Sequence, residues 1–164
     1  MKKANTLIEL IIYIALVSGI GMVSIMFVTN LVTGRVKSVL EENVIHNMRL
    51  STRRISSEIR QSSAIISLAT TDLCLTTSVP SRNPTRIYLS SSRLYLGFGG
   101  SCASPTDSYP LTSADVSVSD LVFKDSTSGD AKTIDFTYKI SGLNTVGRQE
   151  WIYDTTASSS ASIR

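Results

Sequence analysis

A single carboxylate stands at the entrance of a long apolar segment. Glu9 is followed by an uncharged and mostly apolar run over residues 10–32, and the next charge along the chain is Arg35. An acidic residue inside a membrane segment costs on the order of 3 kcal/mol at the helix centre, and by default it marks a functional position. The chemistry open to Glu9 is therefore pairing with a cation of a partner. The alternative is a carboxylate that lies in the lipid headgroup zone and has no role.

The chain has two cysteines, Cys74 and Cys102, both in a part rich in Ser and Thr. Neither belongs to a C-x-x-C pair, so the spacing gives no support to a zinc site or a thioredoxin-like site. If this part lies outside the cytoplasm, a disulfide between them is expected, and it stabilises the fold by roughly 3.6 kcal/mol in the chain-entropy model. Two unlinked thiols are the alternative.

No group of residues has the spacing of a catalytic site. His46 is the only histidine and has no obvious partner, and residues 97–100 are too short for a phosphate-binding loop. A strand end that needs positive φ explains their glycines better. Residues 125–130 hint at calcium but lack the alternating carboxylates and the distal glutamate of a calcium loop, so a hairpin turn is expected. We therefore predict no enzyme activity, no metal and no cofactor.

Composition narrows the class of protein further. The chain has 164 residues, a net charge of +3 and a hydrophobic fraction of 42%, with the apolar residues concentrated near the N-terminus. So mild a positive charge gives no argument for nucleic-acid binding. After Ala69 the chain is rich in Ser and Thr with short runs of β-branched, aromatic and Leu residues, which is typical of short strands.

Residues 10–29 are long enough to span a bilayer core as a helix. Lys2 and Lys3 favour a cytoplasmic N-terminus and place the rest of the chain outside. A secretory signal cut near Gly19 would leave residues 20–32 as an apolar stretch with no obvious place. Cleavage before the apolar run, after Ala4, is more coherent because it retains the segment.

Residues 2–15, with the core Thr6, Leu7, Ile8 and Glu9 directly before the apolar run, resemble the prepilin N-terminal signal. That signal belongs to type IV pilins and to the pseudopilins of type II secretion and competence systems. The resemblance covers about the first thirty residues. Ala4 takes the place that Gly usually has before the cut, and Asn5 takes the place of the usual Phe or Met.

The resemblance implies a maturation route and a set of partners. A prepilin peptidase would cut between Ala4 and Asn5 and methylate the new amine of Asn5. That amine on one subunit would pair with Glu9 of the next, which sets the helix register because an unpaired charge is penalised at every wrong stagger. The implied partners are other pilin subunits, the peptidase, an inner-membrane assembly platform and membrane lipid. The implied location is the cytoplasmic membrane, with the C-terminal domain outside it.

Helical spacing continues beyond the apolar run, and no proline occurs before residue 80. We therefore predict one helix from about Thr6 to about Ser67, apolar all round in its first half and amphipathic in its second. Arg54 and Glu58 lie among the charges of the solvent face and can pair at i, i+4. The apolar stripe consists of Val36, Leu40, Val44, Met48, Ile55, Ile59 and Ile66.

Gly19 and Gly21 are weak points of this helix, since each glycine costs up to about 1 kcal/mol relative to alanine. Local loosening of the helix in a filament and close packing between helices both account for them.

The period changes to two beyond Thr70. Residues 87–98 predict a hairpin around Ser90, Ser91 and Ser92, residues 116–123 an imperfect third strand and residues 134–140 a regular fourth. Residues 151–153 are expected to form a last strand, and residues 155–164 a loose tail or a final edge strand. The predicted fold class is α+β, with a long N-terminal helix packed on a small antiparallel sheet, as in pilins.

The predicted organisation is a leader over residues 1–4, a transmembrane or filament-core helix over 5–33, an amphipathic helix over 34–69 and a β domain over 70–164. The function expected from it is that of a structural subunit, a minor pilin or pseudopilin. A single-pass anchored adhesin or binding domain that does not polymerise is the main alternative. An exported enzyme is the third reading, which the missing catalytic set disfavours.

Overall fold

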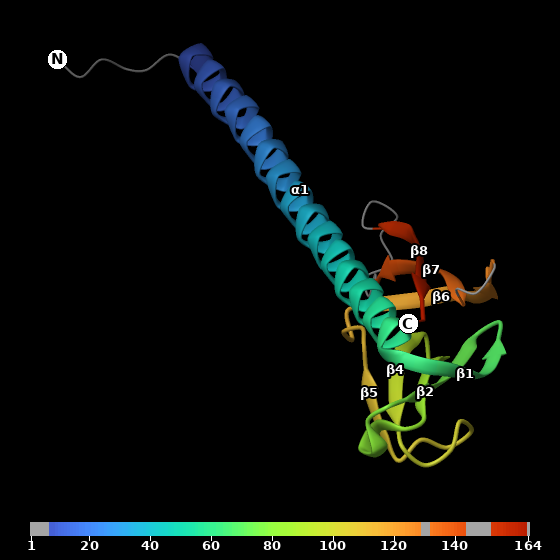
Figure 1. Ribbon diagram of the computed structural model, residues 1–164. Coiled ribbons are helices and arrows are strands. Elements are labelled where there is room, and N and C mark those ends of the chain that lie inside the picture. Colours follow the sequence, from blue (N-terminus) through green and yellow to red (C-terminus); the bar gives the residue numbers. More distant parts are fainter. Residues whose placement is uncertain (1–6, 129–131, 144–151, 164) are drawn as a thin grey trace. The chain divides into compact units, whose positions relative to one another are not determined.

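The computed structural model describes every residue except 1–6, 129–131, 144–151 and 164. Two units make up the chain, Met1–Val39 and Leu40–Arg164. One helix, α1 (Leu7–Gln61), is followed in the described part of the chain by strands and by the short 3-10 helix η1 (Pro80–Arg82) (Figure 1). The strands are β1 (Ser62–Ala69), β2 (Asp72–Thr77), β3 (Thr85–Ser90), β4 (Arg93–Phe98), β5 (Asp107–Pro110), β6 (Val116–Asp125), β7 (Thr133–Gly142) and β8 (Asp154–Ser162). This is the predicted α+β layout.

The helix ends earlier than the sequence pattern predicts. It stops at Gln61, where the prediction continued to about Ser67, and the following residues form β1. The hydroxyl of Ser62 donates to the carbonyl of Ile59 at 2.6 Å, so it satisfies one of the carbonyls that a helix end leaves free. Ile66 matched the helical rhythm but is 52% exposed on β1, which shows that its spacing was accidental.

The strands form two antiparallel sheets, where the sequence predicted one. The first sheet has the order β1-β2-β3-β4-β5, and the second has the order β6-β7-β8. Backbone hydrogen bonds join them at two points, from Val118 to the carbonyl of Ser92 and from Phe123 to the carbonyl of Thr70, both at 2.8 Å. The hairpin pattern alone could not reveal this division, because both sheets are built from antiparallel neighbours in the chain.

The predicted hairpin between β3 and β4 is confirmed. Ser90 pairs with Arg93, and the two loop residues, Ser91 and Ser92, have φ of 48° and 58°. Positive φ at both central residues is the geometry of a type I′ turn, whose twist matches that of the flanking strands. Gly99 and Gly100 follow β4 with φ of 69° and 67°, which confirms the predicted need for positive φ at this strand end.

A β-bulge explains why the pattern of the third predicted strand was imperfect. Asp120 and Leu121 of β6 together stand opposite Tyr138 of β7, and Asp120 has a φ of 53°. The extra residue shifts the alternation by one position, so that Val118 and Leu121 both point into the core. β7 keeps a regular alternation, as predicted.

The last strand lies further along the chain than predicted. Trp151 lies outside the described residues, and Ile152 and Tyr153 belong to no strand. The final strand is β8, so of the two predictions for residues 155–164 the edge strand is correct. Its register with β7 is unbroken from Ser141 opposite Asp154 to Thr133 opposite Ser162.

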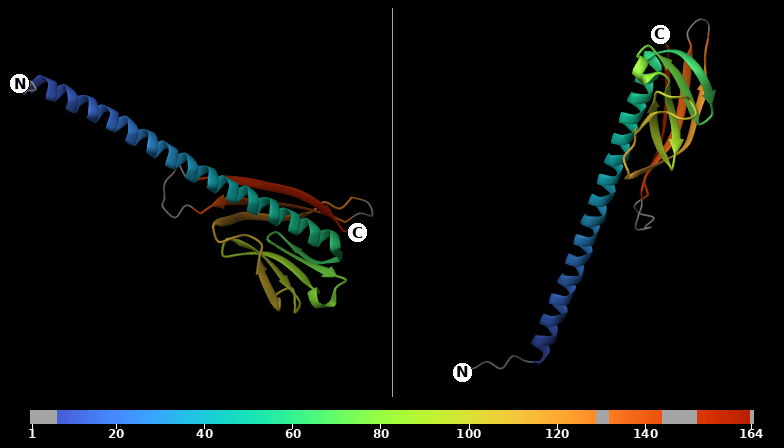
Figure 2. Two further views of the ribbon diagram at one scale, coloured as in Figure 1. Left: turned by 90° about the vertical axis from the view of Figure 1, so that its left-hand side faces the viewer. Right: turned by 90° about the horizontal axis from the view of Figure 1, so that it is seen from below.

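The core of the second unit lies between the C-terminal half of α1 and both sheets, and Figure 2 shows them on that half of the helix. Val44, Ile55 and Ile59 of the predicted stripe are fully buried there, and Leu40 and Met48 are partly buried against them. The strands contribute Leu73, Leu75, Ile87, Leu94, Leu96, Val116, Val118, Leu121, Phe123, Ile134, Phe136, Tyr138, Ile140, Ala157 and Ala161.

Tyr138 connects the middle of β7 to α1 by polar contacts inside this core. Its hydroxyl lies 2.7 Å from the hydroxyl of Ser51 and 2.8 Å from that of Thr52, and it donates to the carbonyl of Met48 at 3.0 Å. Burial raises the pKa of the Tyr138 phenol, and the two hydroxyls oppose this shift in part. The contacts fix the position of the sheet along the helix, because a buried hydroxyl without partners is costly.

We expect Tyr138→Phe to lower the free energy of unfolding by about 1–2 kcal/mol, since it removes these hydrogen bonds and keeps the ring in place. The measurement is urea unfolding of the full chain in detergent micelles. Tyr109→Phe is the matched control, because Tyr109 is 55% exposed. The raised pKa of Tyr138 adds stability that is fully present below pH 10 and is lost as the pH rises further, and the Phe variant should lose that part of the pH dependence. Equal unfolding curves for the two variants would contradict the buried network.

Candidate functional site

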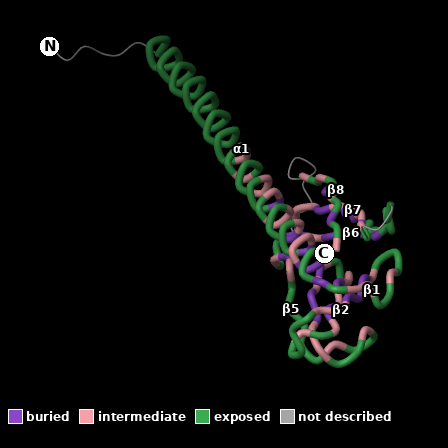
Figure 3. The backbone as a smooth tube through the Cα atoms, in the orientation of Figure 1, coloured by how far each residue is buried: buried purple, intermediate pink, exposed green. Residues whose placement is uncertain are grey.

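The N-terminal half of α1 presents an apolar surface that the chain itself does not cover. Every residue from Leu7 to Val32 is exposed, as the uniformly green part of the helix in Figure 3 shows. Large side chains are among the most exposed, with Leu7 at 78% and Met22 at 77%. So large a continuous apolar surface marks an interaction with a membrane or another protein. By length and composition, α1 is long and apolar enough to cross a bilayer.

Four hydroxyls on this part of α1 are satisfied by their own helix, whereas the polar ends of Tyr13 and Asn30 are exposed and bond to no described residue. The hydroxyls of Ser18, Ser24, Thr29 and Thr33 donate to backbone carbonyls three or four residues earlier, at 2.9–3.0 Å. A hydroxyl bonded in this way adds little cost in lipid, where every polar group must find an internal partner. The segment is therefore apolar along most of its length, and Glu9 is its only charged residue.

Glu9 lies in the first turn of α1, where the helix dipole favours a negative charge. Its side chain is exposed, and no cation of the described residues lies within ion-pair distance of it. Ala4 and Asn5, the predicted processing and methylation positions, lie outside the described residues. Any counter-charge for Glu9 in an apolar environment must therefore come from beyond the described part of the chain.

Gly19 and Gly21 lie within the unbroken helix. A Cβ added to either would have no atom within 4 Å, so neither glycine is needed to relieve crowding within the chain. Close approach of a partner helix and loosening of the helix in an assembly both remain predictions for these positions.

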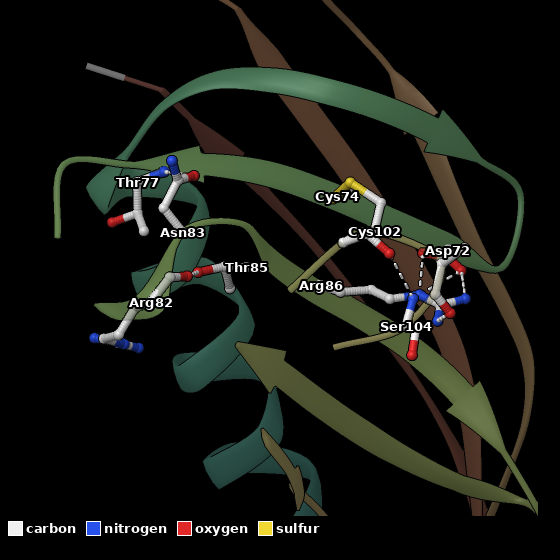
Figure 4. Close-up of a disulfide and its surroundings, with 11 residues drawn as sticks. Asp72, Cys74, Thr77, Arg82, Asn83, Thr85, Arg86, Cys102 and Ser104 are labelled. Carbon is white, nitrogen blue, oxygen red and sulfur yellow. Dashed lines mark hydrogen bonds and ion pairs between the residues drawn. A yellow bond between two sulfur atoms is a disulfide. The ribbon is translucent and has the colours of Figure 1, made fainter. Parts of the chain in front are cut away.

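The predicted disulfide between Cys74 and Cys102 is present. Cys74 lies on β2 and is fully buried, and Cys102 belongs to the loop between β4 and β5 (Figure 4). The bond ties this loop to β2 of the five-stranded sheet.

Arg86 holds the same loop by a second contact. It lies opposite Cys74 on β3, and its guanidinium donates to the carbonyl of Ala103 at 2.9 Å while it binds both carboxylate oxygens of Asp72 (Figure 4). The hydrogen bond with Asp72 raises the pKa of Arg86, so this guanidinium stays charged throughout the accessible pH range. The loop is therefore fixed both by the disulfide and by the hydrogen bond from the Arg86 guanidinium.

Glu58 is a buried carboxylate that the sequence placed on the solvent face. Its side chain is 4% exposed and accepts from Arg54 at 2.9 Å and from Arg82 at 2.6 Å. The predicted pair with Arg54 is confirmed, but Arg82 comes from η1, which no local spacing connects to the helix. Arg82 also lies 4.3 Å from the ring centroid of Phe98. These contacts dock the loop after β2 on the end of α1, which is a structural role.

The remaining candidates show no chemistry among the described residues. His46 is exposed on α1. Asp125 accepts from the backbone of Thr127 at 2.8 Å. Hydrogen bonding by the side chain of Thr127 and then by its backbone lowers the pKa of Asp125, as is usual for a carboxylate that closes a turn. Asp130 lies outside the described residues, and the described ones contain no cluster of three His, Cys, Asp or Glu that could hold a metal ion.

Comparison with known proteins finds no matching family model, no similar curated protein and no similar solved structure. The class that the geometry defines is therefore a coarse one. This is an α+β protein with one long apolar helix able to span a membrane and a disulfide-linked β domain.

We expect the double variant Cys74→Ser and Cys102→Ser to unfold with a free energy about 3–4 kcal/mol lower than the parent, because the bond closes a long loop between residues 28 positions apart. Chemical denaturation of the full chain in detergent measures the difference, and the reduced parent serves as the control with intact residues. Arg86 and Asp72 should keep the folded loop in place, so the variant remains folded. Identical midpoints for oxidised parent and variant would show that the bond contributes nothing.

Proposed function

We propose that this protein is a structural subunit of a type IV pilin-like filament, a minor pilin or pseudopilin that assembles through the N-terminal half of α1. The observation that carries the proposal is the exposed apolar surface with Glu9 as its only charge. The filament would be a type IV pilus, a type II secretion pseudopilus or a competence filament.

In this proposal, the exposed apolar surface is covered first by lipid and later by neighbouring subunits. Before assembly, lipid covers the segment, because it is long enough to span the bilayer core. In the filament, the same segments of neighbouring subunits cover one another, and the hydroxyls of Ser18, Ser24 and Thr29 do not oppose that packing because they bond to their own helix. Moving from lipid to protein keeps the apolar side chains away from water throughout, so assembly requires no exposure of the segment.

Glu9 supplies the specificity that apolar packing lacks. Leu and Ile side chains pack at many staggers with similar energy, whereas a buried carboxylate without a counter-charge is penalised at all staggers but one. Cleavage after Ala4 would create an amine on Asn5, and this amine of one subunit is the counter-charge that we assign to Glu9 of the next. Because methylation keeps an amine protonated, the modified terminus would serve the pair equally.

The proposed partners follow from this mechanism. A prepilin peptidase acts on the N-terminus, and an inner-membrane assembly platform extracts the subunit from the lipid into the growing filament. Lys2 and Lys3 support a cytoplasmic N-terminus in the inner membrane, which leaves the β domain outside. The disulfide fits that side, since such bonds persist in oxidising compartments.

Processing is the first test. We expect mass spectrometry of the protein, expressed together with a prepilin peptidase, to show a mature chain that begins at Asn5 and keeps α1. Expression without the peptidase is the control and should leave the chain uncut. A terminus at Met1 in both cells would favour a plain membrane-anchored domain that never polymerises, and a terminus near Ile20 would favour a secretory signal.

The second test addresses the charge. We expect Glu9→Ala to insert into membranes normally but to enter filaments about tenfold less or worse, since a lost pairing worth 1.4 kcal/mol already changes an equilibrium tenfold. Quantitative immunoblotting of membrane and sheared-filament fractions measures both. Ser18→Ala is the matched control, because Ser18 bonds only to its own helix backbone. Normal incorporation of the Glu9 variant would remove the case for a register charge.

A further inference from the structure

Three of the four sheet edges are closed to further strands. β5 has only four residues and ends at Pro110, and β1 is interrupted by two register shifts in its pairing with β2. β6 carries the bulge at Asp120, and its backbone bonds to Ser92 and Thr70 of the other sheet. Short strands, prolines, bulges and covering loops are the devices by which proteins prevent unwanted pairing at sheet edges.

The fourth edge, β8, has none of these devices in the part of the chain that the structure describes. The strand is nine residues long, contains no proline or lysine, and pairs with β7 without a register shift. No other described strand pairs with its second edge. Such an edge presents a regular row of backbone donors and acceptors to any extended chain beside it.

A groove lies between the middle of β8 and α1. Thr156, Ala157 and Ser158 form one wall of the groove, and its volume is about 310 Å³. Figure 2 shows β8, in red, beside the C-terminal half of α1. The helix wall consists of Met48, Arg49, Thr52 and Arg53. An extended chain that pairs with β8 would therefore lie against one face of the helix.

The helix wall is positively charged, and the described residues supply it with no counter-charge. Arg49 and Arg53 are exposed, lie one helical turn apart, and form no ion pair with any described residue. Arg54 and Arg82, by contrast, are both engaged by Glu58. Two unpaired guanidiniums beside an open row of backbone groups favour a ligand that combines an extended peptide backbone with carboxylates.

We propose that the edge of β8 is a docking site for an extended acidic segment of a partner protein, which adds as a strand to the three-stranded sheet and pairs its carboxylates with Arg49 and Arg53. A second copy of β8 fits less well, since Asp154 is its one acidic residue and already pairs with Lys139 at 2.8 Å. A nucleic acid supplies negative charge but cannot match the alternating donors and acceptors of the strand. This surface is separate from the apolar half of α1, so it is independent of filament assembly.

The experiment uses the full chain in detergent micelles and a blocked eight-residue peptide in which Glu alternates with Val. We expect saturable binding by calorimetry, together with protection of alternate β8 amides from hydrogen exchange. Arg49→Ser combined with Arg53→Ser should weaken binding about tenfold, and added salt should weaken the parent in the same direction. Arg60→Ser is the matched control, because Arg60 is also exposed on α1 but does not line the groove.

Two altered peptides separate strand addition from simple charge attraction. A peptide with N-methyl groups on alternate residues keeps its carboxylates but loses one row of donors, so it should not bind. A peptide with Lys in place of Glu should not bind either. Equal binding of the N-methylated peptide, no binding of the parent peptide, or self-association of the chain through β8 without peptide would each overturn the proposal.

Discussion

The constraint on which the rest depends is the apolar surface of the N-terminal half of α1. The chain leaves all of it exposed, and water is an unfavourable environment for so many Leu, Ile, Val and Met side chains. Lipid and like helices are the two environments that can cover a whole helix without supplying polar contacts. In the proposed filament, the single carboxylate in the first turn would favour one partner position on this otherwise uniform surface. The proposed subunit role rests on these two properties together.

The C-terminal half of α1 has a different role, because it packs against the β domain and holds that domain in a fixed position. Val44, Ile55 and Ile59 supply the apolar contacts, and Ser51 and Thr52 meet the hydroxyl of Tyr138 inside the core. Glu58 fixes the helix end to η1 through Arg82. Apolar burial provides most of the driving force, whereas the buried polar contacts select one arrangement of helix and sheet among several that would bury similar areas.

The β domain fixes one loop firmly and blocks three of its sheet edges, but it leaves the edge of β8 open. The loop that carries Cys102 is held by a disulfide and by Arg86, and three sheet edges are blocked by length, bulge or covering contacts. Among the described strands, β8 keeps a long regular edge next to Arg49 and Arg53, which form no ion pair with a described residue. This contrast supports the proposed docking role of the β8 edge, because the same domain contains the usual features that block sheet edges.

Local patterns in the sequence were sufficient to predict the apolar helix, the lone charge of Glu9, the hairpin around Ser91 and Ser92, and the alternation of β7, because each depends on residues close together in the chain. The pairing of Cys74 with Cys102 was also within reach, since two cysteines allow one bridge. The end of α1 at Gln61, the division into two sheets and the burial of Glu58 depended on contacts between segments far apart in sequence. Such contacts override local periodicity when tertiary packing favours another arrangement, so only the folded chain could decide them.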